Sequence, residues 1–265
     1  MGCLRNPDFE IEPIANHPAL RVGSDDTLIV IADLHLGLSD EFESRGVYVG
    51  GQAESMLSEI KELASVSQHL VILGDLRHEF SAFHSASVIP SFMSELLDHY
   101  STIDLVPGNH DGLIIRQLPQ RVRVHPSSGF NAGCVSFSHG HTWPTDAMMK
   151  GRYLLMGHIH PAVEFVDSRG RSYVEKCWFR VPFRRRDPTG RYGTLPQEAV
   201  VIPAFNPLLN GTPLNRHGDR GLGPVFRNRL VFPERGRLYL LDGTYLGPLK
   251  SNMPVAKSNK GVGSG

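Results

Sequence analysis

The sequence predicts an α/β fold in which two β-sheets pack face to face, with helices on the outside. In residues 27–106, three apolar runs alternate with two amphipathic stretches, which is the order of parallel strands joined by crossover helices. After residue 112, short apolar runs follow one another with Gly and Pro between them, a pattern typical of a β-rich half. A βαβ half followed by a β-rich half therefore indicates two packed sheets.

The first half contains the clearest elements. Strands are predicted at residues 27–32, 70–73 and 103–106. Helices are predicted at residues 52–65 and 85–100, and in the second of these Pro90 is acceptable only near the first turn. Residues 1–23 are expected to form a strand or an arm over the domain edge, and residues 37–50 a loop or a short helix.

The second half is predicted as a series of short strands. They lie at residues 122–124, 134–137, 153–156, 163–166, 172–176, 199–202 and 237–241. We expect residues 1–250 to form one domain, with a basic, β-rich C-terminal part at 163–250. Residues 251–265 are rich in Ser, Gly, Lys and Asn, which predicts a disordered tail.

Five apolar fragments end in clusters of Asp, Asn and His. The second of them in chain order ends in Asp75, a carboxylate beside a buried strand, and such a group costs several kcal/mol unless it is paired. A metal ion is a suitable partner, because the other four fragments supply similar polar groups. These groups are Asp33, His35, Asn109, His110, Asp111, His139, His141, His158 and His160. We therefore expect Asp75 to bridge two metal ions.

The chemistry of these side chains restricts the choice of metal. Carboxylate, imidazole and amide groups suit first-row ions such as Mn, Fe, Ni or Zn. No cysteine belongs to the set, which argues against a zinc site built on thiolates. Each motif alone is weak, but their common position at strand exits fits the rule that open α/β sheets bind ligands beyond the carboxyl ends of their strands.

The order of the five fragments resembles the calcineurin-like metallophosphoesterases, whose pattern is D-x-H, G-D, G-N-H-D/E, H and then G-H-x-H. The matching residues span positions 33 to 160. The resemblance implies a four-layer αββα sandwich of two mixed β-sheets flanked by helices. It also implies two divalent ions and a phosphodiester hydrolase that uses a metal-bridging hydroxide as its nucleophile. Two cations about 3.5–4 Å apart can lower the pKa of such a hydroxide and neutralise the phosphoryl oxygens.

The resemblance also implies a role for each matching residue. One ion would be held by Asp33, His35 and His160. The other would be held by Asn109, His139 and His158, with Asp75 between the two. His110 would be the acid that stabilises or protonates the leaving oxygen, oriented by Asp111. At the fourth fragment both His139 and His141 are available; His139 is favoured because the family ligand usually precedes the Gly directly after the strand, and His141 would then face the site without binding metal. His78 and Arg77 are candidates for positions beside the site, outside the ligand list, with loop residues that do not contact the substrate as the alternative.

Further cues point to the substrate. Residues 74–78 resemble the DNA-repair nuclease branch around SbcD. Residues 33–37, 157–161 and 202–211 resemble the phosphoesterase associated with DNA ligase and large helicases, above all its archaeal relatives. These cues imply a DNA nuclease linked to DNA repair that uses manganese and has a helicase or ligase as a partner. A small-molecule or nucleotide phosphodiesterase or pyrophosphatase, and a non-catalytic adaptor on the same fold, are the alternatives.

The distribution of charge is uneven although the net charge is zero. Residues 1–150 carry a charge of −10 and residues 151–265 a charge of +10. An acidic half that binds metal and a basic half that binds phosphate would fit together. Candidate nucleic-acid contacts are Arg180, Arg184, Arg185 and Arg186, which lie among aromatic residues. A solvated hairpin with Trp178 in the core explains the same pattern equally well.

The sequence also suggests a location. No apolar run reaches the roughly 18 residues that a membrane span needs, and the N-terminus lacks the apolar core of a signal peptide. The cysteines, Cys3, Cys134 and Cys177, are odd in number and widely separated, which favours free thiols in a reducing compartment. We therefore expect a cytoplasmic protein without a membrane partner. A homo-oligomer remains open.

Overall fold

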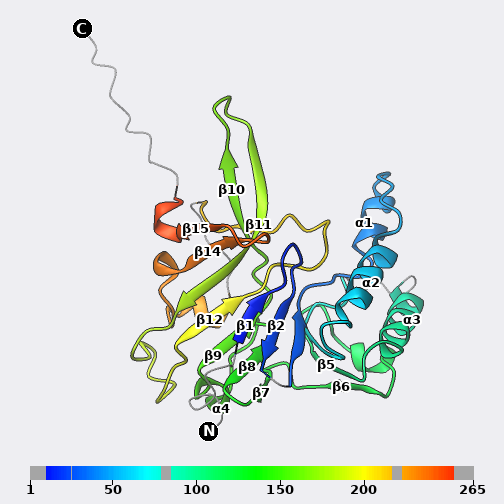
Figure 1. The fold of residues 1–265 in the computed structure, drawn as a ribbon, viewed down its shortest axis with the longest axis horizontal. Coiled ribbons are helices and arrows are strands. Elements are labelled where there is room, and N and C mark those ends of the chain that lie inside the picture. Colours follow the sequence, from blue (N-terminus) through cyan, green and yellow to red (C-terminus); the bar gives the residue numbers. More distant parts are fainter. Residues whose placement is uncertain (1–9, 25, 79–84, 217–222, 254–265) are drawn as a thin grey trace.

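The computed structural model describes residues 10–24, 26–78, 85–216 and 223–253. Two β-sheets pack against each other (Figure 1), and the first has six strands in chain order. They are β1 (Glu10–Pro13), β2 (Leu20–Gly23), β3 (Leu28–Ile31), β4 (His69–Leu73), β5 (Thr102–Val106) and β6 (Val122–Val124). The strands β3 to β6 are parallel, and β1 and β2 are antiparallel to their neighbours, so this sheet is mixed.

The second sheet has nine strands, seven of them in the order β13-β10-β11-β12-β9-β8-β7, with β14 paired to β11 and β15 to β14. Its strands are β7 (Phe130–Ala132), β8 (Val135–Ser138), β9 (Tyr153–Met156), β10 (Pro161–Val166), β11 (Ser172–Pro182), β12 (Glu198–Val201), β13 (Thr212–Pro213), β14 (Arg237–Leu240) and β15 (Tyr245–Pro248). The central strands β8, β9 and β12 are parallel, and the β10–β11 hairpin is antiparallel. This sheet is therefore mixed as well.

Alternation along the strands produces separate cores. On β4, Val71 and Leu73 join Phe137, Leu155 and Trp178 in the core between the sheets. The neighbouring residues on the same strand belong to the core beneath the helices, because successive side chains of a strand point to opposite faces. The two sheets are thus buried on both faces, as an αββα sandwich requires.

The helices cover the two sheets unequally. The helices α1 (Leu38–Ser44), α2 (Gln52–Leu63) and α3 (Ser85–Leu97) lie together beside the first sheet, on the right of Figure 1. On the outer face of the second sheet, the described helices that contribute to the core are short. They are α4 (Asp146–Met149) and α5 (Pro224–Arg227), each four residues long. The 3-10 turns are η1 (Ile114–Gln117), η2 (Pro233–Arg235) and η3 (Leu249–Ser251). The predicted fold class is confirmed, with a thin fourth layer.

Most predicted elements differ from the structure by only a few residues, but some expectations were wrong. Pro90 lies in the second turn of α3 rather than near its first turn. A proline there removes a backbone hydrogen bond, and the buried face formed by Ile89, Phe92 and Met93 compensates by packing on the first sheet. The strand predicted at 172–176 continues to Pro182, and β7, β13 and β15 were not predicted.

The cysteines and the C-terminus also differ from expectation. Cys134 is disulfide-bonded, whereas Cys177 is a buried free thiol. The prediction of free thiols was therefore wrong for Cys134, and the cysteines do not support a reducing compartment. Ser251 belongs to η3 rather than to a disordered tail, and residues 254–265 lie outside the described residues. Among the helices of the described ranges, none is long and apolar enough to cross a membrane.

A buried carboxylate joins three strands at the rim of the first sheet. Asp104 on β5 accepts contacts from His69 Nε2 at 2.5 Å, His125 Nε2 at 2.7 Å and Arg123 Nε at 3.2 Å. Burial raises the pKa of Asp104, but the hydrogen bonds from His69 and His125 outweigh it and lower the pKa below its ordinary value. The ionised carboxylate therefore stabilises the folded chain.

We predict that Asp104→Asn lowers the free energy of unfolding by about 1–3 kcal/mol at pH 7, since a buried ionic hydrogen-bond acceptor is lost. A carboxyl whose pKa is lowered by folding contributes stability that is lost as the pH falls through that pKa. The difference from the wild type should therefore narrow below about pH 4. Urea unfolding at pH 7 and pH 3 measures it, with the exposed Asp98→Asn as control. An equal difference at both pH values would contradict this.

Candidate metal centre

The ends of parallel strands bring the polar fragments together. Strands β3, β4 and β5 are neighbours in one sheet and lead to Asp33, Asp75 and Asn109. Strands β8 and β9 are neighbours in the other sheet and lead to His139 and His158. The carboxyl ends of parallel strands share an edge, so both sheets direct these groups to one place.

The two sheets approach closely at this edge, and two glycines permit it. A Cβ at Gly74 would lie within 2.4 Å of the His139 ring, and a Cβ at Gly157 within 2.7 Å of Asp33 Oδ2. No side chain fits at such distances without displacing the predicted metal-binding residues. Gly74 also has a φ of +74°, which L side chains rarely adopt.

Two groups of side chains have the geometry of a metal site. The first contains Asp33, His35, Asp75 and His160, and the second contains Asp75, His139 and His158. Within each group, one ligand atom from every residue lies within 4.8 Å of the others. Asp75 belongs to both groups. A carboxylate that bridges two ions, which the sequence predicts for Asp75, would have this position.

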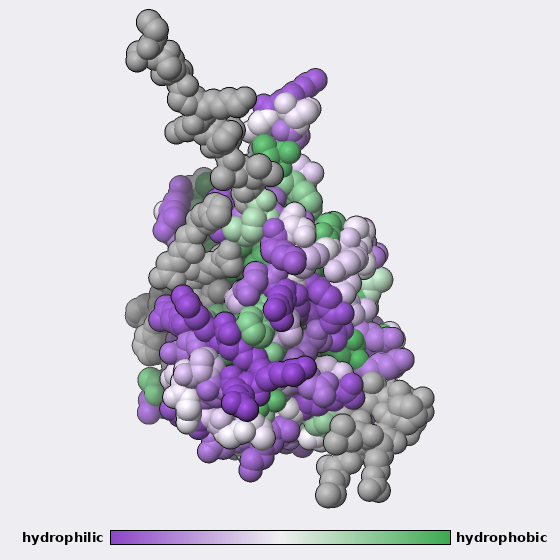
Figure 2. Space-filling model, turned by 90° about the vertical axis from the view of Figure 1, so that its left-hand side faces the viewer, coloured by the Kyte–Doolittle hydropathy of each residue, from purple (hydrophilic) through white to green (hydrophobic). Residues whose placement is uncertain are grey.

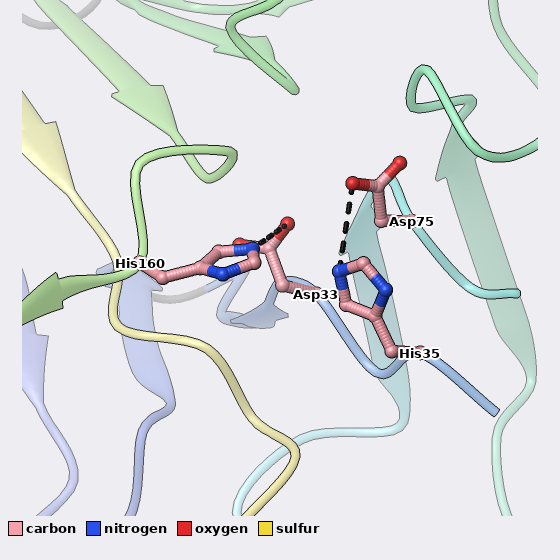
Figure 3. A group of neighbouring side chains, drawn as sticks. All are labelled: Asp33, His35, Asp75 and His160. Carbon is pink, nitrogen blue, oxygen red and sulfur yellow. Dashed lines mark ion pairs between the residues drawn. The ribbon is translucent and has the colours of Figure 1, made fainter. Parts of the chain in front are cut away.

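The first group surrounds a space between two carboxylates (Figure 3). His35 Nε2 lies 3.5 Å from Asp75 Oδ2, and His160 Nε2 lies 3.3 Å from Asp33 Oδ1. Both of these imidazole nitrogens are buried and have no hydrogen-bond partner among the described residues. A free nitrogen lone pair next to a carboxylate oxygen is what a first-row divalent ion requires, so the donor set fits such an ion.

The second group extends to Asn109. His139 Nε2 lies 3.3 Å from Asp75 Oδ2 and 3.1 Å from Asn109 Oδ1. The other ring nitrogen, Nδ1, lies 2.9 Å from Leu73 O, which orients the ring so that Nε2 faces Asp75. The amide oxygen of Asn109, which the sequence predicts as a ligand, thus lies beside the second group.

The backbone of the centre is strained. Positive φ angles occur at Asp33 (58°), His35 (44°), Asp75 (46°), His158 (69°) and His160 (47°). Residues other than Gly rarely adopt such angles, and each costs of the order of 1–3 kcal/mol. Such strain persists only where the surrounding structure holds it, and it concentrates at functional sites. Five of the seven predicted metal-binding residues carry it.

The buried carboxylates of the centre are stabilised by positive charge beside them. Burial raises the pKa of Asp75, but the hydrogen bond and charge of His139 outweigh it, so this pKa lies well below its usual range. Burial lowers the pKa of His139, but Asp75 and Asp33 outweigh it and raise the pKa to about 9. Without an ion, a proton on His139 thus supplies positive charge to two ionised carboxylates.

His110 lies on the loop beside Asp75. Its backbone N–H donates to Asp75 Oδ1 at 2.9 Å, and its ring lies 5.1 Å from that of His35. Asp111 was predicted to orient His110. Its buried carboxylate accepts from the backbone N–H groups of Gly108 and Arg77, and also from Leu76, so it holds the loop that carries His110.

Arg77 braces the same loop from the other side. Its guanidinium donates to His110 O at 3.1 Å and to Gly112 O at 2.5 Å. This role was not visible in the sequence. His141 lies beside the second group, with its ring 5.1 Å from that of His139, and it is outside both groups. His78 contacts His35 through its own ring at 3.2 Å and is likewise outside both groups.

Sequence reasoning missed a further brace that comes from the second sheet. The amide of Asn206 donates to Leu34 O at 2.8 Å and His35 O at 3.3 Å, which holds the loop between the predicted ligands Asp33 and His35. Lys176 Nζ donates to the carbonyls of Ala204 and Asn206, both at 2.7 Å. The sequence of residues 202–211 resembles a phosphoesterase associated with DNA ligase, but nothing in it indicates which residues Asn206 contacts.

The candidate nucleic-acid contacts are not brought to the metal centre. Arg180 pairs with Glu198 at 2.6 Å, and Arg184 donates to Arg229 O and lies over the Phe232 ring. Arg185 and Arg186 are exposed. Pro182 pairs with Glu198 at the amino end of β12, so the segment that follows lies toward the end of the sheet away from the centre. The face of the molecule that Figure 2 shows is largely hydrophilic, with a few scattered hydrophobic residues.

We predict that Asn206→Ala weakens the binding of a divalent ion such as Mn²⁺ by about 10-fold or more, because a residue that supports metal ligands is lost. Two buried carbonyls also lose a donor, which should cost about 1–3 kcal/mol of stability. Calorimetric titration with Mn²⁺ measures the first effect, with the exposed Asn210→Ala as control. Equal affinities in both variants would argue against the brace.

Comparison with known proteins agrees with this fold. A search of curated proteins gave no match. Among solved structures, the nuclease MPE from Pseudomonas putida is similar over 89% of this chain and 100% of its own, with a TM-score of 0.53 and 18% identity. At this identity the similarity shows a shared fold. A protein of unknown function from Aquifex aeolicus, AQ665, is similar over 50% of this chain and 78% of its own, with a TM-score of 0.34 and 17% identity.

The sequence of the chain identifies its family. Residues 27–218 match the family model of the calcineurin-like phosphoesterases, and this range contains all the residues of both ligand groups. The chain therefore belongs to the calcineurin-like phosphoesterase family and is a metal-dependent phosphoesterase.

Proposed function

We propose that the chain is a two-metal phosphodiester hydrolase that acts on DNA. The observation that carries the two-metal part is the position of Asp75, which belongs to both groups of candidate ligands. Asp33, His35 and His160 would hold one ion, and Asn109, His139 and His158 the other. Manganese is the ion we propose, with Fe, Ni or Zn as alternatives that the same donors accept.

The ions would supply a hydroxide nucleophile at neutral pH and positive charge for the phosphoryl oxygens. The residues of this chain would position the remaining groups. The backbone N–H of His110 donates to Asp75, so the imidazole of His110 would lie beside the proposed ligands without being one. That position suits an acid that protonates the leaving oxygen. Asp111 and Arg77 would keep the His110 loop in place.

The substrate is the finer part of the proposal. The similar structure from P. putida is a nuclease, and residues 74–78 resemble a DNA-repair nuclease branch. Asn109 is exposed and His110 half-buried, so this edge of the site is open to solvent, which suits a long substrate. A DNA-repair role and a helicase or ligase partner rest on the sequence alone, and the expected cytoplasmic location has lost the support of the cysteines, because Cys134 is disulfide-bonded. Binding of DNA by Arg180 and Arg184–Arg186 stays a prediction.

The substrate is tested with the purified chain in Mn²⁺. We expect cleavage of single-stranded or end-containing DNA, and loss of that cleavage on adding a chelator. A chain that hydrolyses only bis(p-nitrophenyl) phosphate or dinucleotides would favour the small-molecule phosphodiesterase. Bound metal without activity toward any diester would favour the non-catalytic adaptor.

The catalytic roles are tested by two alanine variants. His110→Ala should lower kcat by about 10²- to 10⁴-fold with near-normal metal content, because only the acid is removed. Asp75→Ala should abolish turnover and reduce the metal content, because it removes a ligand from both groups. Metal analysis and initial rates on the same DNA separate the two outcomes. Wild-type turnover in His110→Ala would refute the assignment of the acid.

A further inference from the structure

Three side chains from different elements form a row that ends at the metal centre. Glu41 lies on α1, His78 follows β4, and His35 follows β3. Glu41 Oε2 lies 2.6 Å from His78 Nε2, and His78 Nδ1 lies 3.2 Å from His35 Nδ1. His35 Nε2, on the far side of its ring, faces Asp75. The function described so far makes no use of Glu41.

The backbone explains why the two imidazoles lie side by side. Leu36 N donates to Leu76 O at 2.9 Å, and His78 N donates to Leu36 O at 3.0 Å, so the two loops run together as a short parallel pair. Gly37, with a φ of +93°, then turns the chain directly into α1. The first turn of this helix therefore lies beside His78, which is only 17% exposed.

The protons in this row can be arranged in one way if His35 binds a metal. Its Nε2 must offer a lone pair, so its proton is on Nδ1 and is donated to His78 Nδ1. His78 then accepts at Nδ1 and carries its own proton on Nε2. That proton is donated to the Glu41 carboxylate, which is an acceptor only. Every donor in the row thus meets an acceptor.

We propose that Glu41 is a positioning residue that acts through His78 on the metal ligand His35. The carboxylate holds His78 in the form that accepts from His35, and this fixes the ring orientation of His35 and strengthens its Nε2 as a donor to the ion. This role rests on the proposed metal-binding function. Because Glu41 lies on α1, the helix α1 would help to hold the metal centre in place.

A simpler role for Glu41 is to place negative charge at the start of α1. Asp40 has the same position relative to the helix dipole, is exposed, and has Ser39 as its hydrogen-bond partner. Arg45 also pairs with Glu41, at 2.5 Å, on the solvent side. Asp40→Ala and Arg45→Ala are therefore matched controls, since they alter the charge of the helix and leave the Glu41–His78 contact in place.

The test is a calorimetric titration of the metal-free full chain with Mn²⁺. Glu41→Ala should lower the affinity for one of the two ions by about 10- to 100-fold, as expected when a partner of a metal-binding histidine is lost. Asp40→Ala and Arg45→Ala should bind as the wild type does. Glu41→Gln, which retains an acceptor oxygen, should recover part of the affinity. Equal affinity in Glu41→Ala and Asp40→Ala would overturn the proposal.

A spectroscopic measurement tests the proton arrangement directly. In the Zn²⁺-loaded, ¹⁵N-labelled chain, His78 should carry its proton on Nε2 and His35 on Nδ1. In Glu41→Ala, His78 should lose this single form. A proton on His78 Nδ1 in the wild type would overturn the proposal. Neither measurement uses a substrate, so a chain with the row intact but no nuclease activity would contradict the proposed function alone.

Discussion

The buried carboxylate of Asp75 is the group on which the rest of the site depends. It lies at the end of a strand with 2% of its surface exposed, and one of its oxygens accepts the backbone N–H of His110. Its other oxygen lies 3.5 Å from His35 Nε2 and 3.3 Å from His139 Nε2. A carboxylate in this position is stable only with positive charge around it, so the surrounding groups are arranged to bind or replace a cation.

That arrangement strains the backbone, and hydrogen bonds between loops hold it. Asp111 and Arg77 join the loops after β4 and β5, so the position of His110 is set by two strands rather than by its own loop. Asn206 and Lys176 join the second sheet to the loop between Asp33 and His35. The positive φ angles at the predicted ligands are therefore supported by contacts that bind no metal themselves.

The structure shows more clearly than the charge pattern which parts of the site each half of the chain supplies. The acidic half supplies the carboxylates and the helices that support the loops, and the basic half supplies two of the four imidazoles, His158 and His160, as well as Lys176 and Asn206. Several of its arginines form ion pairs with glutamates of the same half. Arg180 and Arg237 both pair with Glu198, and Arg216 pairs with Glu164. A count of charges along a chain does not reveal such pairing.

The sequence by itself determined the two-sheet fold, and it predicted the residues that the structure brings together in both groups of candidate ligands, because strand patterns and strand-end motifs are local. It also indicated Asp75 as the shared ligand. Only the tertiary structure decided that Asp111 holds a loop and that Asn206 supports His35. It likewise decided that Glu41 meets His78 and that Arg184 lies toward the far end of the sheet. These facts depend on distances between residues that are 30 or more positions apart in most cases, and local pattern carries no information about such distances.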